Sequence, residues 1–219
     1  MTCDLRPMPE PLDPALVERC RGLDTATLGH WRQWGMCDRR IQAQTSAEKV
    51  IGTAVTLALP GPDGALLHDA LGQLRPGDVL AIDRLGDTLH ACVGGIVARA
   101  ASARGASAIV VDGPIADAEE LRTIGLPIWA HGPGSRTTRR LGLGGRLNAP
   151  ISLAGAVVQP GDLLICDADG VAVLAPDEIE EALARSAARA ERERTIIAGI
   201  AEGRPLAELL PPPALRSVR

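Results

Sequence analysis

The sequence predicts an α/β fold in which residues 1–219 form a single domain, with a compact sheet or partial barrel flanked by helices. Three observations support this prediction. Apolar runs rich in branched residues alternate with helical segments, two strands follow the same Pro-Gly-Asp turn, and no low-complexity segment divides the chain. Aromatic residues make up only 1% of the chain, so the core must consist mainly of Ala, Val, Leu and Ile.

Composition and charge narrow the classes of function. The net charge of -4 is spread over both signs without a basic stripe, and three Trp are the only aromatic residues, so direct nucleic-acid binding is not expected. The first residues are charged and rich in Pro, and no stretch reaches the ~20 apolar residues of a membrane span. The five cysteines lie far apart without a CxxC motif, which favours reduced thiols. We therefore expect a soluble, cytoplasmic protein.

The N-terminal part of the chain begins with helices. Two helices are predicted at about 13–35, the second capped by Asp24 and ended by Gly35. A strand is expected at 49–59, where branched residues alternate with small ones, and a short amphipathic helix at 66–74.

A turn-strand unit then occurs twice. Residues 76–83 and 160–167 each consist of a Pro-Gly-Asp turn, an apolar strand and a final aspartate. Two such units indicate a compact sheet or partial barrel, and they are too few for a solenoid.

The central segment, residues 94–120, combines a helix, a buried strand and a loop that carries carboxylates. The helix is expected to begin at Gly94 and Gly95 and to end at Gly105, and residues 108–111 form the strand. The loop after this strand carries Asp112 and Asp117, and ligands of open α/β sheets bind at such loops.

The C-terminal part adds strands and one long helix. Its expected elements are a helix from Ala118, strands at 126–130, 149–158 and 171–174, and a long helix at about 177–202 that begins with an Asp177–Glu180 capping box and stops at Gly203. The long helix is rich in Arg and Glu, so we expect it on the outside or against another subunit.

Asp117 is the sharpest candidate for a functional residue, and two interpretations are open. It can cap the helix from Ala118, with Glu120 completing a capping box. It can instead bind a hard metal such as Mg²⁺ while the substrate fills the remaining positions. The two roles are compatible, because a cap needs only one carboxylate oxygen.

The glycines before Ile96 also have two interpretations. Gly94 and Gly95 can serve tight packing, or the helix that they open can present the amides of Gly95, Ile96 and Val97 to an anion.

Other polar residues give weaker signals. His68, His90 and His131 are isolated from one another in the sequence, and the Arg136–Arg146 cluster suits either a solvated loop or a clamp for an anion. The acidic run 167–170 resembles the opening of a calcium loop, but its downstream spacing favours a hairpin turn.

Several motifs together resemble the regulator of ribonuclease activity A (RraA-like) family, which includes class II 4-hydroxy-4-methyl-2-oxoglutarate aldolases. The matching stretches are Gly52–Thr56, Pro76–Val79, Gly94 onward, Arg104–Gly105, Val111–Gly113, Asp117, Leu126–Pro127, Pro160–Asp162 and Asp167–Val171. The resemblance implies a swivelling β/β/α fold with a central barrel-like sheet flanked by helices, assembled as a trimer or hexamer.

The same resemblance implies a chemistry and a site. A divalent metal, Mg²⁺ or Mn²⁺, would stabilise a pyruvate enolate while a carbon–carbon bond of a small oxo acid breaks. The expected catalytic residues are Asp117 and Asp112, and the metal residues are Asp117 and, from the C-terminal helix of a neighbouring subunit, Glu191 or Glu193. The substrate-binding positions are Gly94, Gly95, Ile96, Val97, Ala116 and Arg136.

Two positions depart from the aldolase pattern. An Arg normally precedes the metal aspartate and an acid occupies the second helix position, whereas this chain has Ala116 and Gly95. Arg84, Arg136 or His131 are candidates to replace the cation.

Three hypotheses therefore remain. The first is a metal-dependent lyase of the aldolase or decarboxylase type, acting on a small oxo acid. The second is a non-catalytic ring that binds a partner protein such as a ribonuclease. The third is an inactive relative in which Asp117 is only a helix cap.

Overall fold

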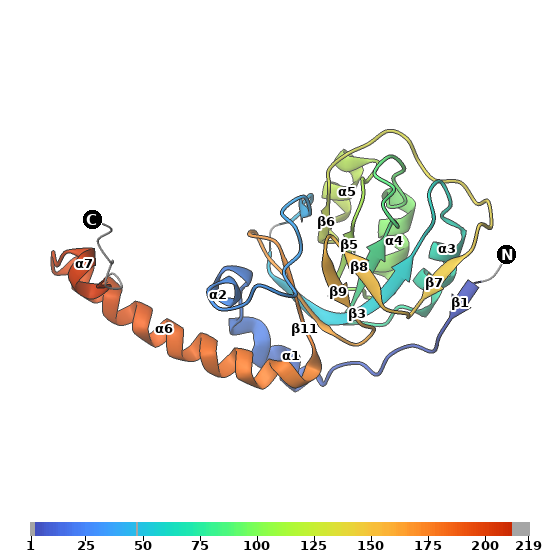
Figure 1. Ribbon diagram of the computed structural model, residues 1–219. Coiled ribbons are helices and arrows are strands. Elements are labelled where there is room, and N and C mark those ends of the chain that lie inside the picture. The colour runs from blue at the N-terminus through green and yellow to red at the C-terminus, as the bar shows by residue number, and fades with distance from the viewer. Residues whose placement is uncertain (1–2, 47, 212–219) are drawn as a thin grey trace, which may run out of the picture.

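A computed structural model describes residues 3–46 and 48–211 (Figure 1). It is a mixed α/β fold with one large curved sheet flanked by helices, which confirms the predicted fold class. The strands are β1 (Cys3–Leu5), β2 (Gln42–Ala43), β3 (Val50–Ala58), β4 (Asp78–Asp83), β5 (Ala108–Val111), β6 (Ile128–Ala130), β7 (Gly145–Leu147), β8 (Ile151–Leu153), β9 (Ala156–Val158), β10 (Leu163–Cys166) and β11 (Val171–Leu174). The helices are α1 (Pro14–Arg19), α2 (Thr25–Gly29), α3 (Ala65–Gln73), α4 (Gly95–Ala103), α5 (Ala118–Ile124), α6 (Ile179–Ala201) and α7 (Leu206–Leu209).

Strand β3 organises the sheet. The main order is β1-β7-β3-β4-β5-β6-β2, and β3 to β6 run parallel. The first half of β3 pairs with β10 and the second half pairs with β7, so both antiparallel neighbours share one edge of this long strand. Because β4, β5 and β6 are parallel, the loops that follow them gather at one edge of the sheet.

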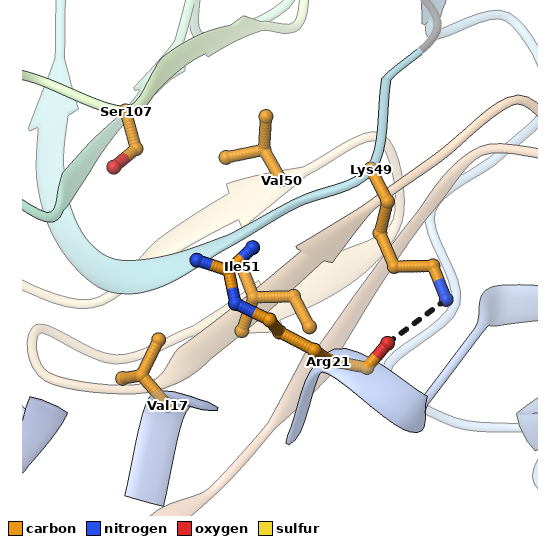
Figure 2. A pocket seen from close by; sticks show the side chains of 6 residues that line it. All are labelled: Val17, Arg21, Lys49, Val50, Ile51 and Ser107. Atoms are coloured by element: carbon orange, nitrogen blue, oxygen red, sulfur yellow. Dashed lines mark hydrogen bonds between the residues drawn. The ribbon is translucent and has the colours of Figure 1, made fainter. Parts of the chain in front are cut away.

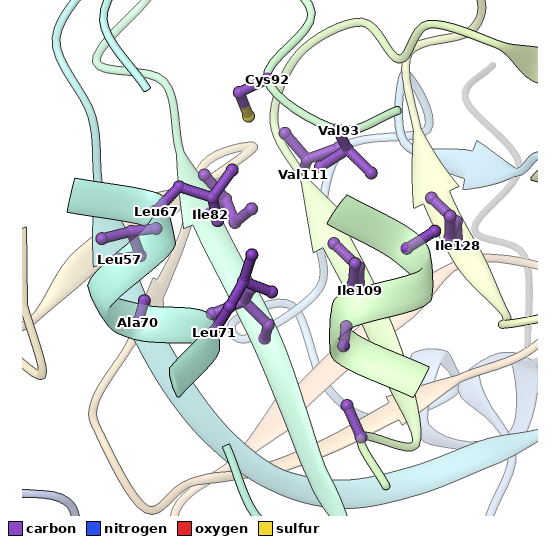
Figure 3. Packing of buried hydrophobic residues seen from close by; sticks show 14 of the residues in the cluster. Leu57, Leu67, Ala70, Leu71, Ile82, Cys92, Val93, Ile109, Val111 and Ile128 are labelled. Atoms are coloured by element: carbon purple, nitrogen blue, oxygen red, sulfur yellow. The ribbon is translucent and has the colours of Figure 1, made fainter. Parts of the chain in front are cut away.

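The two faces of the sheet are covered differently. Helices α3, α4 and α5 cover one face, where Leu57, Ile82 and Ile109 belong to a large apolar cluster (Figure 3). The β8–β9 hairpin covers the other face and packs against Val110 and Trp129. Neighbouring residues of β5 belong to opposite clusters, as the alternation of side chains in a strand requires.

The N-terminal helices and the beginning of α6 form a third apolar cluster against β10 and β11. The remainder of α6 extends away from the sheet, and α7 packs back on it where Leu209 contacts Gly199 (Figure 1). Among the described residues, no helix combines the length and the apolar character needed to cross a membrane.

The repeated Pro-Gly-Asp unit is confirmed as one turn used twice. Asp78 Oδ2 accepts a hydrogen bond from Arg75 N at 2.8 Å, and Asp162 Oδ2 accepts one from Gln159 N at 2.7 Å. The strands that follow the two turns, β4 and β10, both pair with β3. The repeated sequence therefore corresponds to two strands that both begin opposite Thr53 of β3, β4 running parallel to it and β10 antiparallel.

The second N-terminal helix is shorter than predicted. Asp24 caps α2 by accepting a hydrogen bond from Thr27 N, but the helix ends at Gly29 rather than Gly35. The chain instead turns at Gly35 (φ 70°), whose carbonyl accepts a hydrogen bond from Val173 N at 2.7 Å. Pairing with the sheet replaces the last helical turn.

Residues 149–158 form a hairpin and not the single strand that the sequence predicts. Ala154 (φ 46°) and Gly155 (φ 85°) both adopt left-handed backbone between β8 and β9. Gly155 was the available signal for this turn.

The start of α6 also differs from the prediction. Glu178, not the Asp177–Glu180 pair, closes the turn before this helix by accepting a hydrogen bond from Ala175 N at 2.9 Å. Glu180 instead pairs with Arg19. The helix ends near Gly203 (φ 82°), as predicted.

Candidate functional site

Asp117 lies in the loop after β5, directly before α5. This loop is fixed to the segment before α4, because Ile115 and Val93 form a β-bridge and Ala116 N donates to Val93 O at 2.8 Å. The pairing brings Asp117 to the first turn of α4, where its Oδ2 atom accepts a hydrogen bond from Gly95 N at 3.0 Å. The structure thus places Asp117 beyond a buried strand, as the sequence predicts.

The capping box predicted at the start of α5 does not form. Asp117 has left-handed backbone (φ 56°, ψ 39°), and its side chain makes no capping hydrogen bond to the helix that it precedes. Glu120 faces Arg99 of α4, with its Oε1 atom 3.0 Å from Arg99 Nη2. Both carboxylates are directed toward α4, where an amide and a guanidinium are available to them.

Gly94 and Gly95 make room for these carboxylates. A Cβ atom on Gly94 would lie 2.6 Å from Asp117 Oδ2, and one on Gly95 would lie 2.5 Å from Glu120 Cδ. Gly94 has extended backbone (φ -145°, ψ -168°) that other residues also adopt. The absence of a side chain, rather than backbone freedom, is therefore what this position requires.

The start of α4 supplies backbone amides beside Asp117. Ala98 N donates to Gly94 O, so the amides of Gly95, Ile96 and Val97 belong to the first turn, which has no acceptor within the helix. The first of these amides, Gly95 N, donates its hydrogen bond to Asp117. The helix end favours negative charge, so the neighbouring amides suit a carboxylate or another anion.

None of the three candidates to replace the missing cation has a described contact with Asp117. Arg84 is fully buried and donates to Gly61 O, while His131 lies against Asp112. Arg136 lies on an exposed loop and lines a hollow of about 310 Å³ with His90 and Arg139. Ala116 itself is nearly buried and brings no polar side-chain atom.

Arg99 and Glu120 are the polar neighbours that the sequence did not assign to this site. Arg99 lies one helical turn after Gly95, and residues four apart share one face of a helix. That spacing was the available signal, but the pairing with Glu120 depends on how α4 packs against α5.

Asp112 is separated from Asp117 by the contacts of its side chain. It accepts hydrogen bonds from Arg40 Nε at 3.1 Å and Ala154 N at 2.9 Å, and His131 Nε2 lies 2.7 Å away. Burial acts to raise the pKa of Asp112, but these hydrogen bonds outweigh burial and lower its pKa below the usual value. Asp112 therefore ties the β8–β9 hairpin to β5, and the structure does not bring it together with Asp117.

Glu193 is likewise not brought to Asp117 within one chain. It lies on the part of α6 that extends from the sheet, where its Oε1 atom pairs with Arg189 Nε at 2.8 Å (Figure 1). Within residues 3–46 and 48–211, no group of three or more His, Cys, Asp or Glu side chains is arranged to hold a metal.

A cavity of about 420 Å³ lies elsewhere, between the first helical segment and the start of β3 (Figure 2). Its lining residues are Val17, Arg21, Lys49, Val50, Ile51 and Ser107. None of these residues carries a carboxylate, and Lys49 Nζ already donates to Arg21 O at 3.2 Å. The lining of this cavity therefore offers no carboxylate to a hard metal.

Comparison with known proteins identifies the relatives of this chain. The sequence profile of the RraA-like family, described as Aldolase/RraA, matches residues 23–173. A protein of Halalkalibacterium halodurans, whose name assigns it provisionally as a 4-hydroxy-4-methyl-2-oxoglutarate aldolase, is 34% identical over 139 residues. That match covers 64% of this chain and 66% of the relative, so the chain spans slightly less than two thirds of the relative's length.

Two solved structures are also similar. The RNA-processing inhibitor RraA from Thermus thermophilus is 27% identical, with a TM-score of 0.63, covering 69% of this chain and 92% of that one. RraAS2 of Streptomyces coelicolor, described as an unusual member of the RNase ES inhibitor RraA protein family, is 28% identical, with a TM-score of 0.73. It covers 85% of this chain and 97% of its own.

Proposed function

This chain belongs to the RraA-like family, and from that premise we propose that it is a cytoplasmic, divalent-metal-dependent carbon–carbon lyase of the aldolase or decarboxylase type. Its substrate is a small oxo acid. The position of Asp117, with a carboxylate directed to the first turn of α4 at the edge where loops of the parallel strands gather, carries the proposal. The name of the H. halodurans relative supports it.

The residues around Asp117 fit a hard divalent cation. Only the Oδ2 atom of Asp117 has a hydrogen-bond partner among the described residues, which leaves Oδ1 available. The missing side chain at Gly94 gives the carboxylate its room, because a Cβ there would lie 2.6 Å from Asp117 Oδ2. Mg²⁺ and Mn²⁺ prefer oxygen donors, and Mg²⁺ is commonly held by one or two carboxylates together with substrate and water. A single chain therefore does not need a cluster of three side chains.

A cation bound there would polarise the oxo acid and stabilise the negative charge that develops as the carbon–carbon bond breaks. The chain itself binds and orients the substrate. The amides of Ile96 and Val97 would donate to its carboxylate or oxo oxygen, and Asp117 is held in place by Gly95 N.

A second copy of the chain would complete the site. Because α6 extends from the sheet, it can carry Glu193 to the Asp117 of a neighbour in a homotrimer or hexamer (Figure 1). The backbone frame belongs to one subunit, and the additional carboxylate would come from the next.

Isothermal titration with MnCl₂ tests the metal site. Asp117→Asn keeps the shape of the side chain and tolerates left-handed backbone, but it removes the anionic donor. We expect about tenfold or greater weakening of Mn²⁺ binding, with Asp69→Asn on the exposed face of α3 as the matched control. Wild-type protein that does not bind Mn²⁺, or that binds it as well after Asp117→Asn, would contradict the proposal. Turnover of oxaloacetate or of a pyruvate aldol tests the reaction itself.

A second candidate function is a non-catalytic regulator that binds a partner protein such as a ribonuclease. Ala116 and Gly95, which lack the functional groups of the aldolase pattern, favour it, as do the descriptions of the two solved relatives. A stable partner in a pull-down, retained after Asp117→Ala, would support this role, and turnover of an oxo acid would argue against it.

A further inference from the structure

The space of the missing side chain at Gly95 is filled by another carboxylate. An ideal Cβ on Gly95 would lie 2.5 Å from Glu120 Cδ and 2.7 Å from Glu120 Oε1. The carboxylate of Glu120 therefore occupies the position where a side chain at residue 95 would begin. Asp117 contacts the amide of the same glycine, so two carboxylates from the start of α5 lie next to Gly95.

The Arg99 guanidinium forms a hydrogen-bonded ion pair with this second carboxylate. Arg99 Nε and Nη2 lie 3.1 and 3.0 Å from Glu120 Oε1, and the two side chains are 61% and 46% exposed. Arg99 follows Gly95 by four residues, so it lies on the same face of α4 as the start of the helix. An exposed ion pair of this kind contributes little to stability. Exchanging it for contacts with a ligand would therefore cost the fold little.

We propose that the Arg99–Glu120 pair completes the site that Gly95 and Ala116 leave open, with Glu120 as the second carboxylate toward the divalent cation and Arg99 as the cation that binds a substrate carboxylate. This inference rests on the proposed function. A cation beside Asp117 competes with Arg99 for Glu120, and the released guanidinium is then available to the oxo acid.

Removing the charge of Glu120 and removing the charge of Arg99 should have different effects on metal binding. Glu120→Gln removes a donor, so we expect Mn²⁺ binding about tenfold weaker in isothermal titration. Arg99→Gln removes both a competitor for Glu120 and a repelling charge, so we expect Mn²⁺ binding to be as tight as in the wild type or tighter. At saturating Mn²⁺, binding of oxalate, which mimics a pyruvate enolate, should weaken about tenfold in Arg99→Gln.

Matched controls lie on α5, the helix that carries Glu120. Glu119→Gln and Arg122→Gln change exposed residues of α5 that form no ion pair with any residue the structure describes, and should leave both affinities unchanged. If Glu120→Gln behaves like Glu119→Gln while Asp117→Asn abolishes Mn²⁺ binding, this inference is overturned and the proposed function stands. Oxalate affinity equal in Arg99→Gln and Arg122→Gln would overturn the role of Arg99.

A rescue experiment tests whether a carboxylate at residue 95 can replace the carboxylate of Glu120. Gly95→Asp alone forces its Cβ against Glu120, whereas Gly95→Asp with Glu120→Ala gives the new side chain that space. We expect Glu120→Ala to lose Mn²⁺ affinity and the double variant to recover most of it. A double variant no better than Glu120→Ala, with an unchanged circular dichroism spectrum, would contradict the exchange.

Discussion

At the scale of single residues, Asp117 combines an unfavourable backbone with a precise side-chain position. Left-handed backbone is uncommon for residues other than glycine, although Asp and Asn adopt it more readily than most, and Asp117 adopts it (φ 56°). The bridge between Val93 and Ile115 holds the preceding loop, and Gly95 N holds the carboxylate. Such strain is typical of functional sites. The sequence predicted Asp117 as a site residue but predicted the wrong partner for Glu120, because a local capping pattern cannot reveal the packing of α4 against α5.

Gly94→Ala should weaken metal binding at the site while leaving the stability of the fold almost unchanged. The added Cβ would lie 2.6 Å from Asp117 Oδ2, and the carboxylate is the atom group that can yield. We therefore expect about tenfold weaker Mn²⁺ binding with a loss of less than ~1 kcal/mol in unfolding free energy. The measurements are isothermal titration and thermal unfolding.

Gly72→Ala is the matched control for this variant, since it lies in helix α3 and its Cβ would meet nothing within 4 Å. It should keep full Mn²⁺ affinity and gain slightly in stability. Equal Mn²⁺ affinity in the two variants would show that the Asp117 position is unimportant.

At the scale of elements, the junction between α2 and α6 depends on one partly buried ion pair. The Arg32 side chain is buried, and its Nη2 atom lies 2.9 Å from Glu178 Oε2. Its guanidinium stacks 4.8 Å from the centre of the Trp34 ring. The same carboxylate accepts from Ala175 N at the start of α6. The hydrogen bonds from Arg32 are the largest cause that lowers the pKa of Glu178 to about 2. The Asp177–Glu180 pattern in the sequence missed this arrangement because Arg32 is 146 residues away.

Glu178→Gln should make stability less dependent on pH. The pKa of Glu178 in the folded protein is about 2, below its ordinary value of 4.5, so its contribution is present above pH 4.5 and is lost as the pH falls toward 2. We expect the variant to be about 1–2 kcal/mol less stable near neutral pH, a modest value because nearly a third of the side chain (31%) is exposed. Urea unfolding at several pH values measures the difference.

Glu180→Gln is the control for this pH effect, because its pair with Arg19 is exposed and should matter little. The difference between Glu178→Gln and the wild type should shrink steadily between pH 4.5 and 2. A difference that is constant over this range would rule out the ion pair as its cause.

At the scale of the whole molecule, the sheet divides the polar residues between its faces while α6 leaves apolar residues uncovered. Asp112 joins the hairpin face, and Asp117 joins the face with α4 and α5. Ile197 and Ile200 on α6 are 64% and 49% exposed, and Leu206 after it is 55% exposed. The two isoleucines lie in the last turns of α6, and Leu206 begins α7; α6 extends away from the sheet (Figure 1). This arrangement fits the homo-oligomer that the proposed site requires.

Ile197→Glu tests whether this end of α6 contacts another copy. Burying a charge without a partner is costly, so we expect the variant to shift from an oligomer toward the 22.8 kDa monomer. Light scattering after size exclusion measures the mass. Ala187→Glu, at an exposed position of the same helix, should keep the mass of the wild type. A wild-type monomer, or an Ile197→Glu variant with unchanged mass, would contradict the prediction.

The sequence by itself determined the fold class, the repeated Pro-Gly-Asp turn, the helix–strand–loop around Asp117 and the end of α6 near Gly203, because these depend on local periodicity and turn residues. Only the tertiary structure decided which side chains meet. In the folded chain Asp112 contacts Arg40 and His131. Glu120 lies against Gly95 and pairs with Arg99. Contacts between elements depend on how helices and strands pack, and a pattern read along one segment does not contain that information.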